Sequence, residues 1–298
     1  MRDKMIEQLI GLQEEIYNYE IRDFDTGEAK EYFIDYSPKI EFSKTGEFYS
    51  LSFYGDGYDD DPNIKAIDFD YQTNFAFCRF LDFLSEQQNA DKIISLHFGG
   101  SDVGANGTKS WMFNRLVNAD VTFPNLKTFS IRLTDLGDHN QSIIDCDFSM
   151  EESGMVAKLV LKMPNLENLI IPSAPDKSFF EIGKHPLSSL KVQAGYDHQN
   201  FIENLSESDN FYQLSVLDYT EVIDIFDKKE EEYTSFENFK KLFRSKAFSN
   251  VGLFKLRGSI LTEDQLFELQ KLNNVQFLNI VAKGGRYVSH LMQDKSNK

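Results

Sequence analysis

A glycine-rich segment from Gly99 to Ser110 has the residue types of a phosphate-binding loop. It follows an expected strand and precedes an expected helix, which is where such loops hold phosphate with backbone N–H groups. In the G-x-x-x-x-G-K-[ST] pattern the lysine directly follows the last glycine, whereas here Thr108 stands between Gly107 and Lys109. The extra residue displaces the ammonium group by roughly 3 Å. The pattern therefore favours an ordinary loop, and nucleotide binding at 99–110 stays an alternative.

An acidic segment over residues 55–61, Gly-Asp-Gly-Tyr-Asp-Asp-Asp, supplies carboxylates of the kind that bind calcium. An EF-hand loop that began at Asp56 would need glycine at its sixth position and glutamate at its twelfth. Asp61 and Ile67 occupy those positions. We interpret the segment as a solvated acidic turn, with a calcium-regulated switch as the alternative.

Other catalytic and metal-binding patterns do not emerge from the sequence. The histidines are far apart and lack the H-E-x-x-H spacing, and no G-x-S-x-G motif occurs. Two cysteines, Cys78 and Cys146, match neither a zinc pattern nor a secreted disulfide framework. We therefore predict a protein that is not an enzyme and that uses no metal and no cofactor. The histidines are His97, His139, His185, His198 and His290.

Composition narrows the class of partner. Asp and Glu number 48 against 31 Lys and Arg, which gives a net charge of −17 over 298 residues. Repulsion from phosphate disfavours nucleic acid and anionic membrane surfaces as ligands. The first residues lack the apolar stretch of a signal peptide, and no apolar run approaches the length of a membrane span. We expect a cytoplasmic protein whose 27 phenylalanines serve packing.

A repeated pattern, apolar-x-x-apolar-x-apolar, predicts the elements that position these residues. The pattern is typical of a strand. A repeated strand followed by a helix cannot bury its apolar side alone, so neighbouring units must stack into a solenoid. The seven copies are Ile93-Leu96-Phe98, Leu126-Phe129-Ile131, Leu166-Leu169-Ile171, Leu187-Leu190-Val192, Leu214-Leu217-Tyr219, Val251-Phe254-Leu256 and Val275-Leu278-Ile280.

Helical patterns alternate with these strands, and Thr262 to Gln265 has the form of a capping box. Residues 1–90, with a helix over 1–19 and short strands near 32–36, 48–53 and 64–69, are predicted to form an N-terminal α+β cap. Residues 91–298 are predicted to form an irregular repeat array, in which the acidic run 227–232 is a solvated insertion. The expected helices of the array span 110–118, 153–163, 197–207, 235–246, 262–272 and 285–294.

Three segments, at 123–129, 163–169 and 249–258, resemble leucine-rich repeats of the ribonuclease-inhibitor-like type. Over about residues 64–282 the order of elements resembles a group of bacterial cytoplasmic leucine-rich-repeat proteins without established function. The resemblance implies an α/β horseshoe with a parallel concave sheet, outer helices and partner binding on the sheet. The chain departs from the family by lacking a regular asparagine or cysteine after each strand.

In the repeated pattern, the residues between the core-facing apolar positions should point away from the core. On the six later strands these positions hold five basic and two acidic residues, in contrast to the acidic chain. We predict a non-catalytic module that binds a protein partner, acidic or mixed in charge, on this face. The alternative is that scattered basic residues merely keep the sheet soluble. The predicted partner-binding residues are Lys127, Arg132, Lys191, Lys255, Arg257 and Phe277.

Overall fold

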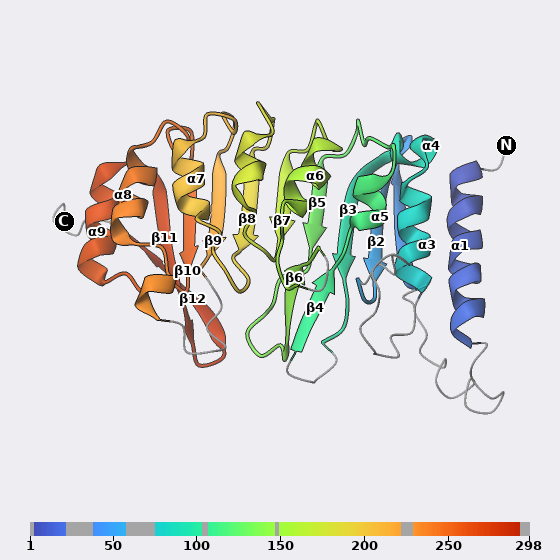
Figure 1. Ribbon diagram of the computed structural model, residues 1–298, viewed down its shortest axis with the longest axis horizontal. Coiled ribbons are helices and arrows are strands. Elements are labelled where there is room, and N and C mark those ends of the chain that lie inside the picture. Colours follow the sequence, from blue (N-terminus) through green and yellow to red (C-terminus); the bar gives the residue numbers. More distant parts are fainter. Residues whose placement is uncertain are drawn as a thin grey trace.

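The computed structural model describes residues 3–21, 38–57, 75–102, 107–146, 149–221 and 229–292. They form an α/β fold in which a ten-stranded sheet runs along the long axis of the molecule (Figure 1). Strand order in the sheet follows chain order. The strands are β1 (Ile40–Thr45), β2 (Phe48–Tyr54), β3 (Ile93–Gly99), β5 (Thr128–Ile131), β7 (Asn168–Ile171), β8 (Ser189–Gln193), β9 (Val216–Thr220), β10 (Leu253–Arg257), β11 (Gln276–Lys283) and β12 (Arg286–Leu291).

The sheet is parallel from β2 to β11 and antiparallel at its two ends. Each of the seven repeated segments contributes one parallel strand, as the pattern predicts. β2 pairs directly with β3, so the early strand pair joins the same sheet. An α/β fold with a mostly parallel sheet is therefore confirmed.

Helices cover one face of this sheet (Figure 1). The Thr262 capping box forms as predicted, with Thr262 accepting from the Gln265 backbone N–H. No described helix is long and apolar enough to cross a membrane. The helices are α1 (Lys4–Ile21), α3 (Phe75–Leu84), α4 (Gln87–Ala90), α5 (Asn114–Asn118), α6 (Met155–Leu161), α7 (Phe201–Glu207), α8 (Phe236–Arg244) and α9 (Glu263–Leu272), with 3-10 turns at Lys177–Glu181 and Glu230–Glu232.

The core lies between the sheet and the helices. In six of the seven repeated segments every apolar residue of the pattern is buried. Aromatic rings fill much of this space: the ring of Phe98 lies 5.0 Å from that of Phe113 and 5.5 Å from that of Phe129. The prediction that phenylalanine serves packing holds for these rings. Buried apolar area of this kind is the main favourable contribution to folding.

Helix α1 covers the N-terminal end of this core and reaches the first edge strand. Its apolar stripe, which includes Leu9 and Ile16, is buried. The Gln13 side chain donates to the backbone oxygen of Ile40 in β1. The carboxylate of Asp3 accepts hydrogen bonds from Lys44 and Tyr49, which hold its pKa well below the usual range.

The last repeat differs from the prediction. Phe277 is fully buried, and its ring stacks on that of the register partner Phe254 with centroids 5.2 Å apart. Leu278, expected in the core, lies half-buried beside Lys255 instead. The proposed role of Phe277 as an exposed partner-binding anchor is therefore wrong, because its side chain belongs to the core.

Several element boundaries also differ. The helix expected over 285–294 is replaced by β12, which returns antiparallel to β11. The helix expected over 110–118 begins only at Asn114, because Gly107–Trp111 forms β4. β4 pairs in parallel with β6 (Asn140–Ile144) in a second, two-stranded sheet that the sequence reading missed. The strands expected near 32–36 and 64–69 lie outside the described residues.

Candidate functional site

The sheet face opposite the helices, here called the open face, carries the side chains that alternate with the core residues. Most of them are half-buried or exposed, in contrast to the buried side chains on the helix side; Ser130 and Asp218 are buried. Strand register aligns them in a central row that crosses the sheet. This row consists of Ser52, His97, Ser130, Ile170, Lys191, Asp218, Lys255, Leu278 and Leu291.

The chemistry of the open face changes along this row. Over β2 to β5 the row carries small hydroxyl groups, and the Nδ1 atom of His97 lies 2.8 Å from the Ser130 hydroxyl oxygen. From β8 onward it carries charged and apolar side chains. Serine supplies little contact area, whereas long cationic and apolar side chains supply both area and charge. The C-terminal part of the open face is therefore the better equipped for binding.

Two of the predicted basic residues lie on β5 or beside it and are already paired. Lys127 Nζ lies 2.7 Å from a carboxylate oxygen of Glu167. Arg132 donates two hydrogen bonds to Asp138, of 2.9 and 3.0 Å, and a third to the backbone oxygen of Gly100. These contacts fix both side chains in place and neutralise their charge.

A second pair of predicted residues shares one carboxylate at the C-terminal part of the open face. Asp218 is 5% exposed and accepts hydrogen bonds of 2.9 and 2.8 Å from the Arg257 guanidinium. Lys255 Nζ lies 3.8 Å from the same carboxylate. The Arg257 guanidinium also lies 5.3 Å from the ring centre of Tyr287. Bidentate pairing makes Arg257 a rigid feature of this surface.

Lys191 is the predicted basic residue with no ion pair among the described residues. It lies between Ile170 and Asp218 in the central row. The register places Lys191, Lys255 and Arg257 at open-face positions of their strands, and Lys127 and Arg132 lie next to β5; four of the five have a carboxylate partner. Counting charged residues along the strands overestimates the positive charge of the open face. Asp138, the partner of Arg132, lies in a loop and is not among the counted positions.

Exposed apolar side chains accompany these charges at the C-terminal part of the open face, and sequence reasoning missed two of them. Tyr287 and Leu291 on β12 are 41% and 42% exposed. Leu291 lies beside Leu278 across the β11–β12 ladder. The signal in the sequence that could have revealed β12 is the Gly284-Gly285 pair, which predicts a hairpin turn between two β-type segments.

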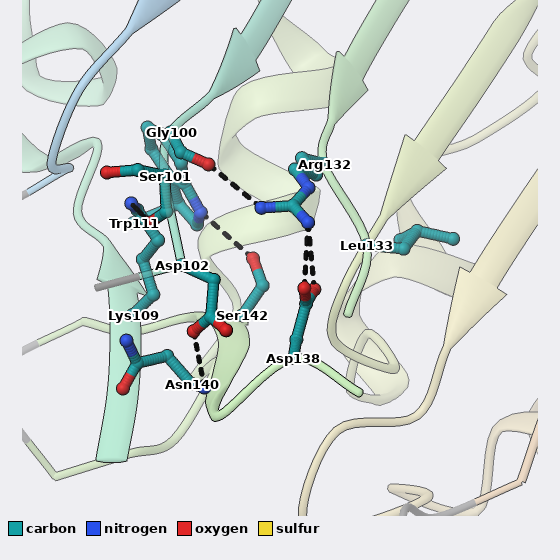
Figure 2. Close-up of a pocket in the computed structure, with 10 residues that line it drawn as sticks. All are labelled: Gly100, Ser101, Asp102, Lys109, Trp111, Arg132, Leu133, Asp138, Asn140 and Ser142. Carbon is teal, nitrogen blue, oxygen red and sulfur yellow. Dashed lines mark hydrogen bonds and ion pairs between the residues drawn. The ribbon is translucent and has the colours of Figure 1, made fainter. Parts of the chain in front are cut away.

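At the end of β3 and β5 a small pocket gathers the polar residues of the glycine-rich segment (Figure 2). Lys109 donates to the Ser101 backbone oxygen at 2.8 Å and lies 3.3 Å from the Asp56 carboxylate. Burial lowers the pKa of the Lys109 ammonium group. Asp102 accepts from the backbone N–H groups of His139 and Asn140, and these bonds together with that from the His139 ring lower its pKa to about 2. Each charged group of this pocket thus already has a polar partner within the protein.

The glycines of the two candidate loops have a structural explanation. A Cβ atom on Gly100 would overlap the Gly55 backbone oxygen and the Lys109 ammonium group. A Cβ atom on Gly57 would overlap the Trp111 ring. The two segments approach so closely that only glycine fits. Residues 58–61 and 103–106, where a calcium or phosphate ligand would also be expected, lie outside the described residues.

One buried carboxyl group lies at the end of β9. Glu221 is 1% exposed, and its Oε2 atom accepts from the Thr234 backbone N–H and hydroxyl at 3.4 and 3.3 Å. Burial raises its pKa to about 7. The neighbouring Tyr219 hydroxyl is buried as well, and burial raises its pKa. No group of three or more His, Cys, Asp or Glu in the described residues has the arrangement of a metal site.

Neither a known protein family, nor a curated protein, nor a solved structure matches this chain.

Proposed function

We propose that this chain is a non-catalytic, cytoplasmic protein-interaction module of the leucine-rich-repeat type, whose solenoid presents the open face to a protein partner. The observation that carries the proposal is the central row, in which aligned side chains cross the sheet from β2 to β12. Such a row offers a continuous platform rather than a cleft around a reacting group.

The platform is suited to binding because its side chains are held before a partner arrives. Arg257 is fixed by Asp218, and the strands that carry the row are fixed by the packed core beneath them. Little conformational entropy is then lost on association. Leu253 and Leu278 add apolar area next to Lys255, and Tyr287 adds it next to Arg257, so a partner surface with both acidic and apolar residues fits best.

Site-specific photo-crosslinking tests which face binds. A photoreactive amino acid replaces Ile170 or Leu253 on the open face and, as the matched control, Lys158 or Lys241 on the exposed side of the helices. In a native lysate we expect both open-face positions to crosslink to the same protein and the helix positions to leave it free. Equal capture from the helix positions, or no capture from the open face, would refute the proposal.

The nucleotide- or calcium-regulated alternative receives less support. The Lys109 ammonium group that would hold phosphate already contacts Ser101 and Asp56. Calorimetry with ATP, GTP and calcium measures this alternative directly. We expect no binding of ATP, GTP or calcium. Binding to the unchanged protein that disappears in Lys109→Ala would favour this alternative over the interaction proposal.

A further inference from the structure

The last strand of the sheet has an open edge. β12 pairs with β11 on one side, and no strand in the described part of the chain pairs with its other side. Every β12 residue except the half-buried Val288 is exposed. An edge of this kind is a template for an added strand, because its outer N–H and C=O groups lack partners in the sheet.

The hairpin turn determines which groups line this edge. Gly284 and Gly285 have φ of 58° and 73°, and Lys283 pairs with Arg286, which defines a two-residue turn closed by a hydrogen-bonded pair. In an antiparallel ladder every second pair exchanges hydrogen bonds. Met292 N–H donates to Phe277 O at 2.9 Å, in agreement with this alternation. The backbone groups of residues 287, 289 and 291 therefore point toward the open edge.

Side chains at this edge separate into two faces. Tyr287, Ser289 and Leu291 lie on the open face, continuous with Leu278 and the rest of the central row. Arg286, Val288 and His290 lie on the opposite side. An added strand that places apolar residues beside Tyr287 and Leu291 would extend the open face.

Charge indicates what kind of strand fits. Residues 273–292 include Lys283 and Arg286 but no aspartate or glutamate, although the whole chain contains 48 acidic residues. Arg257 lies beside Tyr287 on the open face. Cross-strand pairs of opposite charge stabilise a ladder, and like charges destabilise it. The edge is therefore complementary to an acidic segment.

We propose that β12 takes up an extended segment of the protein partner as an additional strand, and that acidic and apolar residues alternate in that segment. The apolar residues pack beside Tyr287 and Leu291, and the carboxylates lie on the side of β12 that carries Arg286, with the ammonium group of Lys283 one strand further away. This inference rests on the proposed function, since it names how the partner of the open face is anchored.

The probe is a short fluorescent peptide that alternates valine and glutamate, compared with one that alternates valine and lysine. Fluorescence anisotropy with the full chain should show binding of the glutamate peptide and at least about tenfold weaker binding of the lysine peptide. Failure of the glutamate peptide to bind, or equal binding of both peptides, would overturn the proposal.

Ser289→Pro tests the backbone contact. It removes an N–H group that points to the open edge and not to β11, so the fold should persist, as circular dichroism will show. We expect about tenfold weaker binding of the glutamate peptide. Ser289→Thr, which keeps the donor, is the matched control and should bind like the unchanged protein. Arg286→Glu should reverse the preference between the two peptides. Unchanged binding by Ser289→Pro contradicts strand addition.

Two measurements separate the outcomes. Sedimentation velocity that shows a dimer, lost in Ser289→Pro, would mean that a second copy occupies the edge, and the proposal would fail. If open-face crosslinks persist from Ile170 and Leu253 while the glutamate peptide does not bind, strand addition fails and the proposed function stands. If the crosslinks are absent and the peptide binds only through Ser289 and Arg286, the edge is the binding site and the platform is not.

Discussion

The two ends of the sheet are completed by different elements, a helix at the first end and a β-hairpin at the other. At the first end α1 packs beside α3 and supplies Gln13 and Asp3 to the edge strand β1. At the other end β12 closes the sheet, and its side chains and outer edge are largely exposed. The difference teaches that a helix can cover a core and also reach a strand edge: α1 buries its apolar stripe and bonds to the β1 backbone at Ile40, although four of the six β1 residues are exposed. At the C-terminal end the edge strand β12 is exposed at all its residues except the half-buried Val288.

The largest expected effect tests whether the C-terminal end is closed by its core. Phe277→Ala removes a fully buried ring that stacks on Phe254, and we expect it to lower the free energy of unfolding by about 4 kcal/mol. Leu278→Ala, one residue away on the open face, should cost about 1 kcal/mol. Urea denaturation measures both. Similar small losses for the two variants would mean that Phe277 is not part of the core.

The next prediction compares two leucines, one buried at the first end of the sheet and one exposed at the other end. Leu9→Ala in the buried stripe of α1 should lower the free energy of unfolding by about 3 kcal/mol. Leu291→Ala in β12 should cost less than about 0.5 kcal/mol, because that side chain is 42% exposed. Thermal unfolding of the two variants checks the contrast. A Leu291→Ala loss as large as that of Leu9→Ala would show that β12 is packed rather than open.

pH should affect the N-terminal end and the C-terminal half in opposite directions. Burial raises the pKa of Glu221 from 4.5 to about 7, so the folded state keeps a proton that the unfolded chain releases. Stability therefore falls as pH rises through this window, by up to about 3 kcal/mol. The lowered pKa of Asp3 has the opposite sign: its contribution is present above its unfolded pKa and is lost as pH falls.

Urea midpoints at pH 5 and pH 8 measure this effect. Glu221→Gln, which cannot ionise, should abolish the loss at the higher pH and leave stability at pH 5 nearly unchanged. A wild-type chain and a Glu221→Gln variant with parallel pH profiles would contradict the assignment.

The last comparison concerns the hydrogen bond between α1 and the edge strand β1. Gln13→Ala removes the hydrogen bond to the Ile40 backbone oxygen and should cost about 1 kcal/mol. Hydrogen exchange should become faster in β1 and stay unchanged in β12. Gln13→Glu is a useful companion, because it keeps the size of the side chain but cannot donate. Faster exchange at both ends would mean that the loss is global rather than local.

Sequence patterns predicted the parallel strands well because each repeat alternates buried and exposed residues in a clear phase. The last repeat failed because Phe277 and Leu278 are both apolar, so either one satisfies the pattern. Only the register with Phe254 on the neighbouring strand decides between them. That information is tertiary, and local periodicity does not contain it.

The candidate site was predicted in part. The positions of Lys191, Lys255 and Arg257 on one face, with Lys127 and Arg132 beside β5, followed from the strand pattern. Their ion pairs did not, because Asp138 approaches Arg132 from a loop and Asp218 reaches Arg257 across strands. The glycines near 55–57 and 99–100 suggested ligand loops, whereas their described contacts show two backbones in close approach.

Strand order that follows chain order has a consequence for synthesis on the ribosome. Each strand from β2 onward can dock on its predecessor as soon as it leaves the exit tunnel, without waiting for any later segment. Assembly would then proceed from one end to the other, and every intermediate would expose one fresh edge. β12 is the last of the described strands to dock, and its outer edge is the kind of surface that each earlier strand offers before its successor arrives.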